Sequence, residues 1–371
     1  MTDTFSVSRR ATLAGLLVTP VALLARTSTA SACSLAFVND RGIAKIVVRS
    51  MDLPVALPER PILVVFPRGM ARDSQTSVLP GIHAKLEGAG PNTMRWTSKF
   101  GCVAMVSFEG TATDGLNEKG LAAHMLVLGV SELEPPDNRP ILPDTHWAQY
   151  VLDNFATVNE VVDAHRAGKF RLAAAWAPDL GLHRHLAVHL AVQDPSGDSA
   201  VLELVKGKLV IHHGPEIRVL TNDPPYDEMI EEVKQYAAFG GPKPLPGDVG
   251  AVDRFVRLSE FSRYLPEPKT YEQAVGGALS LLRTAQVAFR DPARVNGGNA
   301  GFWGAVQTNW VTAADVTNRI YYVNSATVPS LLWLDLKKVN FAKGASLLFL
   351  DPHDPKVGGD ARTQLRRWAK G

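Results

Sequence analysis

The chain of 371 residues has only two cysteines, Cys33 and Cys102. In an oxidising compartment two cysteines often form a disulfide. However, Cys102 lies in the strand-like segment 100–108, where a free thiol behaves as a small apolar core group. A single bridge would also add little to a chain long enough to bury a large core. We therefore expect two free thiols, with Cys102 inert.

An excess of charge of either sign is also lacking. The chain has 39 lysines and arginines against 37 aspartates and glutamates. Residues 1–32 hold three of the arginines and one aspartate, so 36 charges of each sign follow. A neutral chain has no overall field to attract DNA or an anionic membrane, and no basic stripe is present. We expect no nucleic-acid partner.

Cofactor and metal motifs are missing as well. The sequence has no Walker motif, no dinucleotide-binding glycine pattern and no Gly-x-Ser-x-Gly. His183, His185 and His189 alternate as on one face of a strand, and three imidazoles suit zinc. No Asp, Glu or Cys at ligand spacing completes that site, and His212 and His213 are discounted on the same ground. We therefore predict neither a cofactor nor a metal.

The N-terminal segment has the parts of a secretory signal peptide. The pair Arg9-Arg10 precedes an apolar run, 11–25, and the small residues Ala30-Ser-Ala32 follow it. That run is shorter than the ~20 residues that a membrane-spanning helix needs. We expect residues 1–32 to be removed, which makes Cys33 the first residue of the mature chain. The arginine pair fits twin-arginine export, so the predicted location is periplasmic or secreted.

Cleavage directly before a cysteine also occurs in lipoproteins. Ala30, three positions before Cys33, stands where a lipoprotein usually has leucine, and firm anchoring takes two lipid signals. We expect no stable membrane anchor. A non-catalytic periplasmic lipoprotein attached through Cys33 is kept as an alternative of another class.

Residues 33–371 are expected to form a single domain, since neither a linker nor a repeat interrupts them. A block of strands is expected first, and a helical block follows it. A second block of strands, a second helix and a last block of strands come after. The expected strands are 43–49, 61–67, 102–108, 186–192, 200–205, 209–213, 319–323 and 331–336. The expected helices are 147–167 and 271–289, with capping boxes at Thr157/Glu160 and Thr270/Gln273. Such blocks favour a layered α+β fold over a repeating βαβ sheet.

A mature chain that begins at Cys33 would carry a nucleophile and its base on one residue. The α-amine, with a pKa of ~7.7–8.0, can take the proton of the thiol directly or through one water. Arg49, at the end of the expected strand, would favour the thiolate. Asp52, expected just past a turn, would orient the ammonium group. Without Cys33 the two would be typical of an exposed ion pair worth ~0–1 kcal/mol.

These three residues resemble the choloylglycine hydrolases, the group of penicillin V acylases and bile salt hydrolases among the N-terminal-nucleophile hydrolases. Further motifs extend the resemblance over about residues 33–340. They are Asp114-Gly-Leu-Asn-Glu-Lys-Gly-Leu121, Leu220-Thr-Asn-Asp-Pro-Pro-Tyr-Asp227, and Leu245-Pro-Gly247 with Asp253-Arg-Phe255.

The resemblance implies a four-layer αββα sandwich, hydrolysis of linear N-acyl amides and a homotetramer. Asn222 would donate its side-chain amide to the oxyanion, and Arg254 would steady the polar network around Cys33 and Asp52. On sequence alone Asn222 fits an Asn-x-Pro turn and Arg254 a solvated helix face.

Segments 96–101, 147–157 and 334–341 are similar to the Gram-negative branch of the family, some of whose members also cleave N-acyl homoserine lactones, the quorum signals. That branch usually has tryptophan where this chain has Leu53 and Val127. Two aliphatic residues in place of two indoles predict a roomier, aliphatic substrate pocket. Val127 also offers no polar side chain, so a backbone N–H would have to serve as second oxyanion donor. Bile salt hydrolysis is the alternative within the family, and the sequence ranks neither acyl chains nor leaving amines.

Overall fold

The computed structural model describes residues 33–54, 60–80, 92–108, 110–174, 186–291, 293–294 and 305–369. The expected signal peptide, 1–32, lies outside the described residues, as do His183 and His185. Within the described part of the chain, no helix is long and apolar enough to span a membrane.

Within the described residues, seven strands form the first sheet. In their order across the sheet they are β14 (Val219–Leu220), β1 (Ser34–Val38), β2 (Ile46–Pro54), β15 (Val306–Asp315), β16 (Ile320–Ser325), β17 (Leu332–Asp335) and β19 (Gly359–Asp360). The pairings are antiparallel except that of β17 with β19. Cys33 directly precedes β1, so the first sheet positions it.

A second sheet contains nine of the described strands. In order they are β13 (Lys208–His213), β12 (Ser199–Val205), β11 (Val188–Gln193), β8 (Ala122–Val127), β7 (Thr111–Asn117), β6 (Cys102–Ser107), β3 (Ile62–Phe66), β18 (Leu348–Leu350) and β20 (Arg366–Arg367). Two small pairs lie outside it: β4 (Ala71–Asp73) with β5 (Arg95–Thr97), and β9 (Ile141–Pro143) with β10 (Arg171–Ala173).

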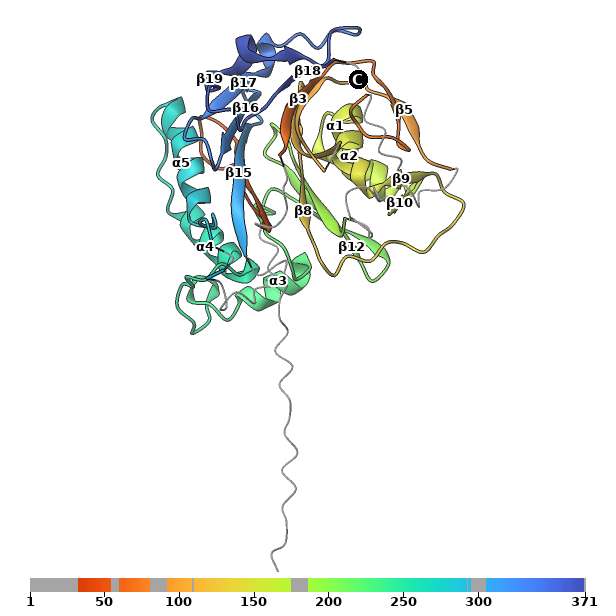
Figure 1. The fold of residues 1–371 in the computed structure, drawn as a ribbon. Coiled ribbons are helices and arrows are strands. Elements are labelled where there is room, and N and C mark those ends of the chain that lie inside the picture. The colour runs from red at the N-terminus through yellow and green to blue at the C-terminus, as the bar shows by residue number, and fades with distance from the viewer. Residues whose placement is uncertain are drawn as a thin grey trace, which may run out of the picture.

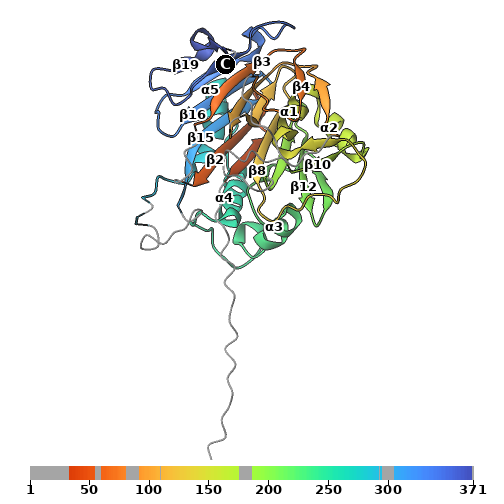
Figure 2. The same cartoon turned by 45° about the vertical axis from the view of Figure 1, so that its right-hand side comes forward.

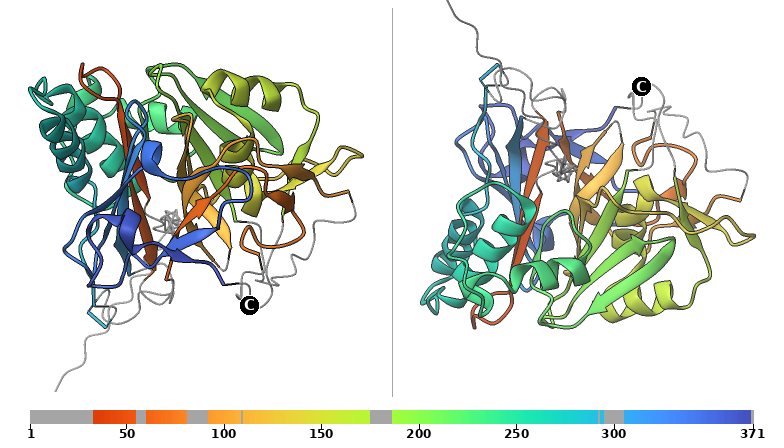
Figure 3. Two further views of the ribbon diagram at one scale, coloured as in Figure 1. Left: turned by 90° about the horizontal axis from the view of Figure 1, so that it is seen from above. Right: turned by 90° about the horizontal axis from the view of Figure 1, so that it is seen from below.

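The two sheets stack face to face, and helices cover both outer faces (Figures 1 and 3). Helices α4 (Ala251–Arg263) and α5 (Tyr271–Arg283) pack on β1 and its neighbours, with α3 (Tyr226–Val233) beside α4. Helices α1 (Trp147–Asn154) and α2 (Val158–Arg166) cover the second sheet. Figure 2 shows β2 and β8 close together, where the sheets meet. The predicted four-layer α+β sandwich is confirmed.

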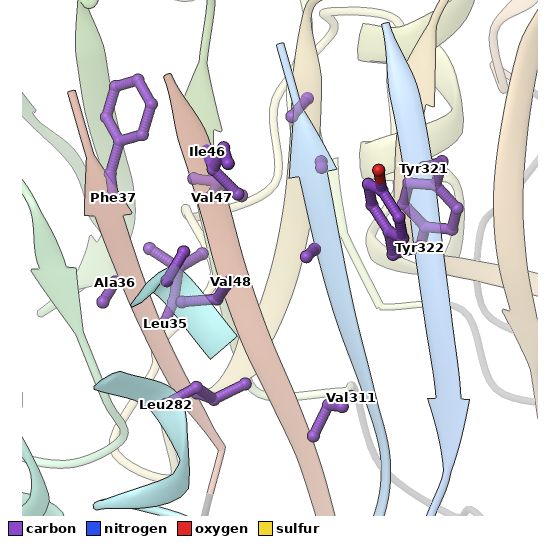
Figure 4. Packing of buried hydrophobic residues seen from close by; sticks show 14 of the residues in the cluster. Leu35, Ala36, Phe37, Ile46, Val47, Val48, Leu282, Val311, Tyr321 and Tyr322 are labelled. Atoms are coloured by element: carbon purple, nitrogen blue, oxygen red, sulfur yellow. The ribbon is translucent and has the colours of Figure 1, made fainter. Parts of the chain in front are cut away.

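Four layers explain why the central strands are buried on both faces. Every residue of β1 and of β2 is buried, because one face meets the other sheet and the opposite face meets α4 and α5. The register pairs Ala36 with Val48, and both belong to the same buried cluster as Leu282 of α5 (Figure 4). The next residue along, Phe37, points the other way by strand alternation.

The predicted helices exist, but tertiary contacts shorten them. The expected helix 147–167 is two helices, because Phe155 and Thr157 are extended and Thr157 caps α2 by accepting from the amide of Glu160. The expected helix 271–289 ends at Arg283. Beyond it, Val287 and Thr308 exchange hydrogen bonds, so pairing with the first sheet replaces further helix.

The predicted end of the strand that carries Arg49 is wrong, and this is the boundary that matters most for the site. The sequence indicated a strand that ends at Arg49 with a turn before Asp52, but β2 continues through both residues to Pro54. Charged residues normally mark a strand end, since burying them is costly without partners. Here both side chains are fully buried and partnered. Arg49 and Asp52, three positions apart, therefore lie on opposite faces of the sheet.

Candidate active site

Cys33 lies directly before β1, with its side chain on the face that meets the second sheet. Its side chain is buried, and its Sγ lies 3.8 Å from the sulfur of Met51 and 3.8 Å from Nη2 of Arg49. The backbone N–H of Cys33 donates to Oδ1 of Asn222 at 2.6 Å. The structure thus holds both the sulfur and the nitrogen of this residue beside polar groups.

The guanidinium of Arg49 is fixed from three sides. Its Nη2 donates to the carbonyl of Met125 at 2.7 Å and approaches the Met51 sulfur at 3.4 Å. The charge sits 4.5 Å from the ring centre of Trp310, a cation–π geometry. Its Nε lies 3.8 Å from Asp114. Arg49 thus places a permanent positive charge beside the Cys33 sulfur.

Behind Arg49 lies a buried carboxylate that the sequence prediction missed. Asp114 accepts a hydrogen bond from Tyr321 and lies 2.6 Å from Nδ1 of His124. Burial alone would raise the pKa of Asp114, but His124 and Arg49 lower it below its usual range. Asp114 opens the motif 114–121, which the sequence assigned to a turn; its first four residues end β7, and residues 118–120 form the turn.

Asp52 does not contact Cys33 among the described hydrogen bonds. Its carboxylate points toward the helix layer, where it accepts from Ser50 at 3.0 Å and from Thr308 at 2.5 Å. Burial raises the pKa of Asp52 to about 6, against the opposing influence of Arg254 and the two hydroxyls. The Cys33 nitrogen of this chain is a peptide nitrogen, so the expected hydrogen bond from a Cys33 ammonium group to the Asp52 carboxylate stays a prediction.

Arg254 joins the elements around Cys33 from the helix side. Its Nη1 donates to the Cys33 carbonyl at 2.5 Å and to the Ser34 hydroxyl at 2.6 Å. Its Nη2 donates to Oδ1 of Asn222 at 3.1 Å, and its Nε binds the carbonyl of Val249. The side chain is fully buried, and that burial lowers its pKa. Arg254 is thus no solvated helix residue.

Asn222 bridges the two sheets rather than closing a local turn. Its Oδ1 accepts from Cys33 and Arg254, and its Nδ2 donates to the carbonyl of Val127 at 2.8 Å. A side-chain amide carries two N–H donors, so the bond to Val127 uses one of them. Asp223 holds the chain just past β8 by accepting from the amides of Gly129 and Val130.

A bulge in β7 opens the edge of β8 beside this site. The register between β6 and β7 shifts around Thr113, and β7 pairs with β8 only over Ala122–His124. Bulges commonly end pairing and redirect chains next to active sites. Beyond His124, the β7 side of β8 is free for other partners.

Two of the predicted site residues bind to this freed edge. The backbone N–H of Leu128 donates to the carbonyl of Ala187, on the β11 side of β8. Because backbone groups alternate in direction along an antiparallel strand, those of Met125 and Val127 point to the β7 side. Arg49 binds the carbonyl of Met125, and Asn222 binds that of Val127. The N–H of Val127 therefore lies on the same edge of β8, between the carbonyls that Arg49 and Asn222 bind.

The two predicted pocket residues are placed differently. Leu53 follows Arg49 and Met51 on the face between the sheets and is buried, next to the Cys33 site. Val127 lies two positions after Met125 and therefore on the same face of β8, and Met125 packs toward the helices that cover the second sheet. Val127 thus contacts the site through its backbone, and its side chain shares the face of Met125.

Both cysteines are free, as predicted. Cys102 lies in β6, packs toward α1 and accepts from Nε2 of Gln149 at 3.5 Å. Burial raises the pKa of its thiol well above the usual range. Cys102 is therefore an inert core residue. No cluster of three His, Cys, Asp or Glu residues able to hold a metal occurs in the described part of the chain.

Solved structures with the same arrangement define the class of protein. The structure of a penicillin V acylase from Agrobacterium tumefaciens superposes with a TM-score of 0.75 at 31% identity, over 91% of this chain and 98% of that one. A variant of conjugated bile acid hydrolase from Clostridium perfringens gives 0.67 at 19% identity, over 86% and 97%; this shows the shared fold. The class is that of the N-terminal-nucleophile hydrolase fold.

Sequence comparison narrows the class. The family model of the linear amide C–N hydrolases, choloylglycine hydrolase family, matches residues 33–358. A penicillin V acylase from Pectobacterium atrosepticum is 36% identical over 321 residues, which is 79% of this chain and 83% of that protein. The chain belongs to the choloylglycine hydrolase family and is an amidohydrolase that acts on linear amides.

The buried carboxylate of Asp52, which feels the charge of Arg254, predicts an acid limit to activity. Protonation of Asp52, whose pKa is about 6, removes the charge that offsets Arg254, and Arg254 in turn holds the Cys33 carbonyl. We expect kcat/KM for a linear amide to fall as the pH drops through about 6, and Asp52→Asn to lower the plateau and remove that limb. An identical acid limb in Asp52→Asn, measured between about pH 4.5 and 8, would contradict this.

Proposed function

We propose that Cys33, freed by removal of residues 1–32, is the nucleophile that cleaves N-acyl amides. One observation carries the proposal: buried groups hold both the sulfur and the nitrogen of Cys33, at 3.8 Å from Arg49 and 2.6 Å from Asn222. The family match that begins at the same residue supports it.

The proposed reaction has two steps, and Cys33 serves both. The sulfur attacks the carbonyl carbon of the substrate amide, and the thiol proton passes to the α-amine of Cys33 and then to the leaving nitrogen. The C–N bond breaks, which releases the amine and leaves a thioester. Water then attacks the thioester, with the α-amine as base, and releases the carboxylic acid and the free thiol.

The freed edge of β8 supports an oxyanion site beside the sulfur. We assign one donor to the remaining N–H of the Asn222 side chain and the other to the backbone N–H of Val127. Each such donor is typically worth ~10²–10³ in rate. A backbone donor makes the role of Val127 independent of its side chain. Asp52 and Arg254 then position Cys33, the first residue of the mature chain, from the face of the sheet that α4 and α5 cover.

The proposal includes export of the chain to the periplasm or beyond, since cleavage after Ala32 creates the required amine. The buried thiol of Cys33, 1% exposed, supports a free nucleophile over a lipid attachment point. Assembly into a homotetramer is proposed by resemblance to the family.

For the substrate class, we propose N-acyl amides with an extended acyl chain, including penicillin V and N-acyl homoserine lactones. The penicillin V acylases at 36% and 31% identity support the first. The position of Leu53 supports the second, because an aliphatic residue beside Met51 and Cys33 offers a wall for alkyl groups.

Maturation tests the proposal directly. Any residue left before Cys33 converts the base amine into an amide, so a chain that begins one residue earlier should lose at least about 10²-fold in kcat/KM. The measurement compares mature protein with a form extended by Ala32, the start of each established by N-terminal sequencing. Full activity of the extended form would refute the mechanism.

The two cysteines provide a matched pair of variants. Cys33→Ala should abolish hydrolysis with an unchanged circular dichroism spectrum, because the nucleophile is lost while β1 stays paired. Cys102→Ala removes a buried thiol remote from the site, so we expect an unchanged kcat/KM and a loss of about 1 kcal/mol in unfolding free energy. Equal losses of activity in both would show that Cys33 is not the nucleophile.

Acyl length should govern turnover. Each further buried CH₂ contributes up to about 0.8 kcal/mol, a little under fourfold in kcat/KM when realised in the transition state. We expect kcat/KM to rise along a series of N-acyl homoserine lactones with acyl chains of about 4 to 12 carbons, and the longest to exceed penicillin V. A flat profile, or Leu53→Trp leaving the order unchanged, would show that Leu53 does not line the acyl site.

A further inference from the structure

A second buried polar cluster lies directly beneath the segment that carries Asn222. His189 of β11 and Glu203 of β12 are both buried, at 0% and 1% exposure. Nδ1 of His189 lies 2.9 Å from a Glu203 oxygen, and Nε2 lies 2.8 Å from the carbonyl oxygen of Thr221. The sequence offered His189 only as a discounted metal ligand.

Glu203 fixes the other side of the same segment. Its carboxylate accepts from the backbone amide of Tyr226 at 2.9 and 3.2 Å, which is the first residue of α3, where a negative charge is favoured. His189 and Glu203 therefore grip the chain one residue before Asn222 and four residues after it. The Thr221 hydroxyl adds a bond to the carbonyl of Ala251 at the start of α4.

The hydrogen-bond partners of His189 determine its protonation. A carbonyl oxygen can only accept, and so can an ionised carboxylate. Burial opposes ionisation of Glu203, but His189, His212 and the Tyr226 amide lower its pKa to about 2. Both ring nitrogens of His189 consequently face acceptors, and both must carry a proton for the two bonds to form.

The charged groups around His189 are consistent with a cation. From β12 it faces Glu203, whose second oxygen lies 3.3 Å from Nε2 of His212 on β13, outside hydrogen-bond geometry. His212 in turn lies 3.6 Å from Asp227 of α3. No Lys or Arg forms an ion pair with Glu203 among the described residues, so His189 supplies the nearest buried positive charge.

We propose that His189 is a positioning residue for the oxyanion site: held as an imidazolium by Glu203, it fixes the Thr221 carbonyl and thereby the side chain of Asn222. The inference rests on the proposed role of Asn222, but its first test does not depend on activity.

Neutron diffraction from deuterium-exchanged crystals of the mature protein at about pH 7 tests the protonation. We expect deuterium on both Nδ1 and Nε2 of His189. A ring with a single deuterium would overturn the proposal, whatever the enzyme hydrolyses.

Kinetics of His189→Gln test the positioning. An interaction made only in the transition state lowers kcat with little change in KM. We expect kcat to fall by about 10–100-fold, less than the ~10²–10³ for complete loss of one oxyanion donor, because Asn222 is displaced and not removed. Alkylation of Cys33 by iodoacetamide develops no oxyanion, so its rate should stay unchanged. His213→Gln is the matched control and should leave kcat unaltered, because His213, next to His212 on β13, pairs with Asp198 at 2.8 Å.

The results of these experiments distinguish the positioning role of His189 from the proposed role of Cys33 as the nucleophile. An unchanged kcat in a folded His189→Gln, or an equal loss of kcat and of alkylation rate, overturns the positioning role. If alkylation of Cys33 leaves hydrolysis intact, the proposed nucleophile fails, while the neutron result still decides the state of His189. The neutron result also decides if His189→Gln does not fold.

Discussion

The burial of the Arg254 guanidinium is the interaction on which the arrangement of this site depends. A buried charge is tolerated only when its donors are matched, and Arg254 matches them with groups from β1, from the 221–225 segment and from the start of α4. Three parts of the chain that lie far apart in sequence must therefore come together before this charge is satisfied. Cys33 is one of the residues they enclose.

The fold separates the two sides of Cys33. Its sulfur lies between the sheets with Arg49, Met51 and Asp114, while its carbonyl and the Asp52 carboxylate face the helix layer with Arg254. The charge of Arg49 thus lies beside the sulfur, and the charge of Arg254 lies beside the backbone carbonyl. Because the sheet itself lies between them, the two guanidinium groups do not compete for the same partner.

Much of this fold was predictable from local pattern, since alternating blocks of strands and helices are set by apolar periodicity and by caps such as Thr157 with Glu160. The course of β2 was not. The sequence shows Arg49 and Asp52 as polar residues typical of a turn, and only their partners on β8 and β15 explain why the strand continues.

The candidate site was predictable in its residues more than in its geometry. Cys33, Asn222 and Arg254 do come together, as the family motifs indicated. The supporting residues Thr308 and Trp310 gave no local signal, since each acts through a residue more than 250 positions earlier. In the sequence, His189 is only a polar residue in an apolar strand. That pattern indicates neither its hydrogen-bond partners nor a metal.

The opened edge of β8 has a consequence for how such an enzyme diversifies. Arg49 and Asn222 bind carbonyls of β8, and the Val127 N–H lies between them, so the backbone of this strand presents its polar groups to the nucleophile whatever side chains it carries. A substitution at Val127 changes the side chain on the helix-covered face of the sheet and leaves the backbone N–H where it is. The packing of this strand and the polar groups that it offers to the site are therefore free to change separately.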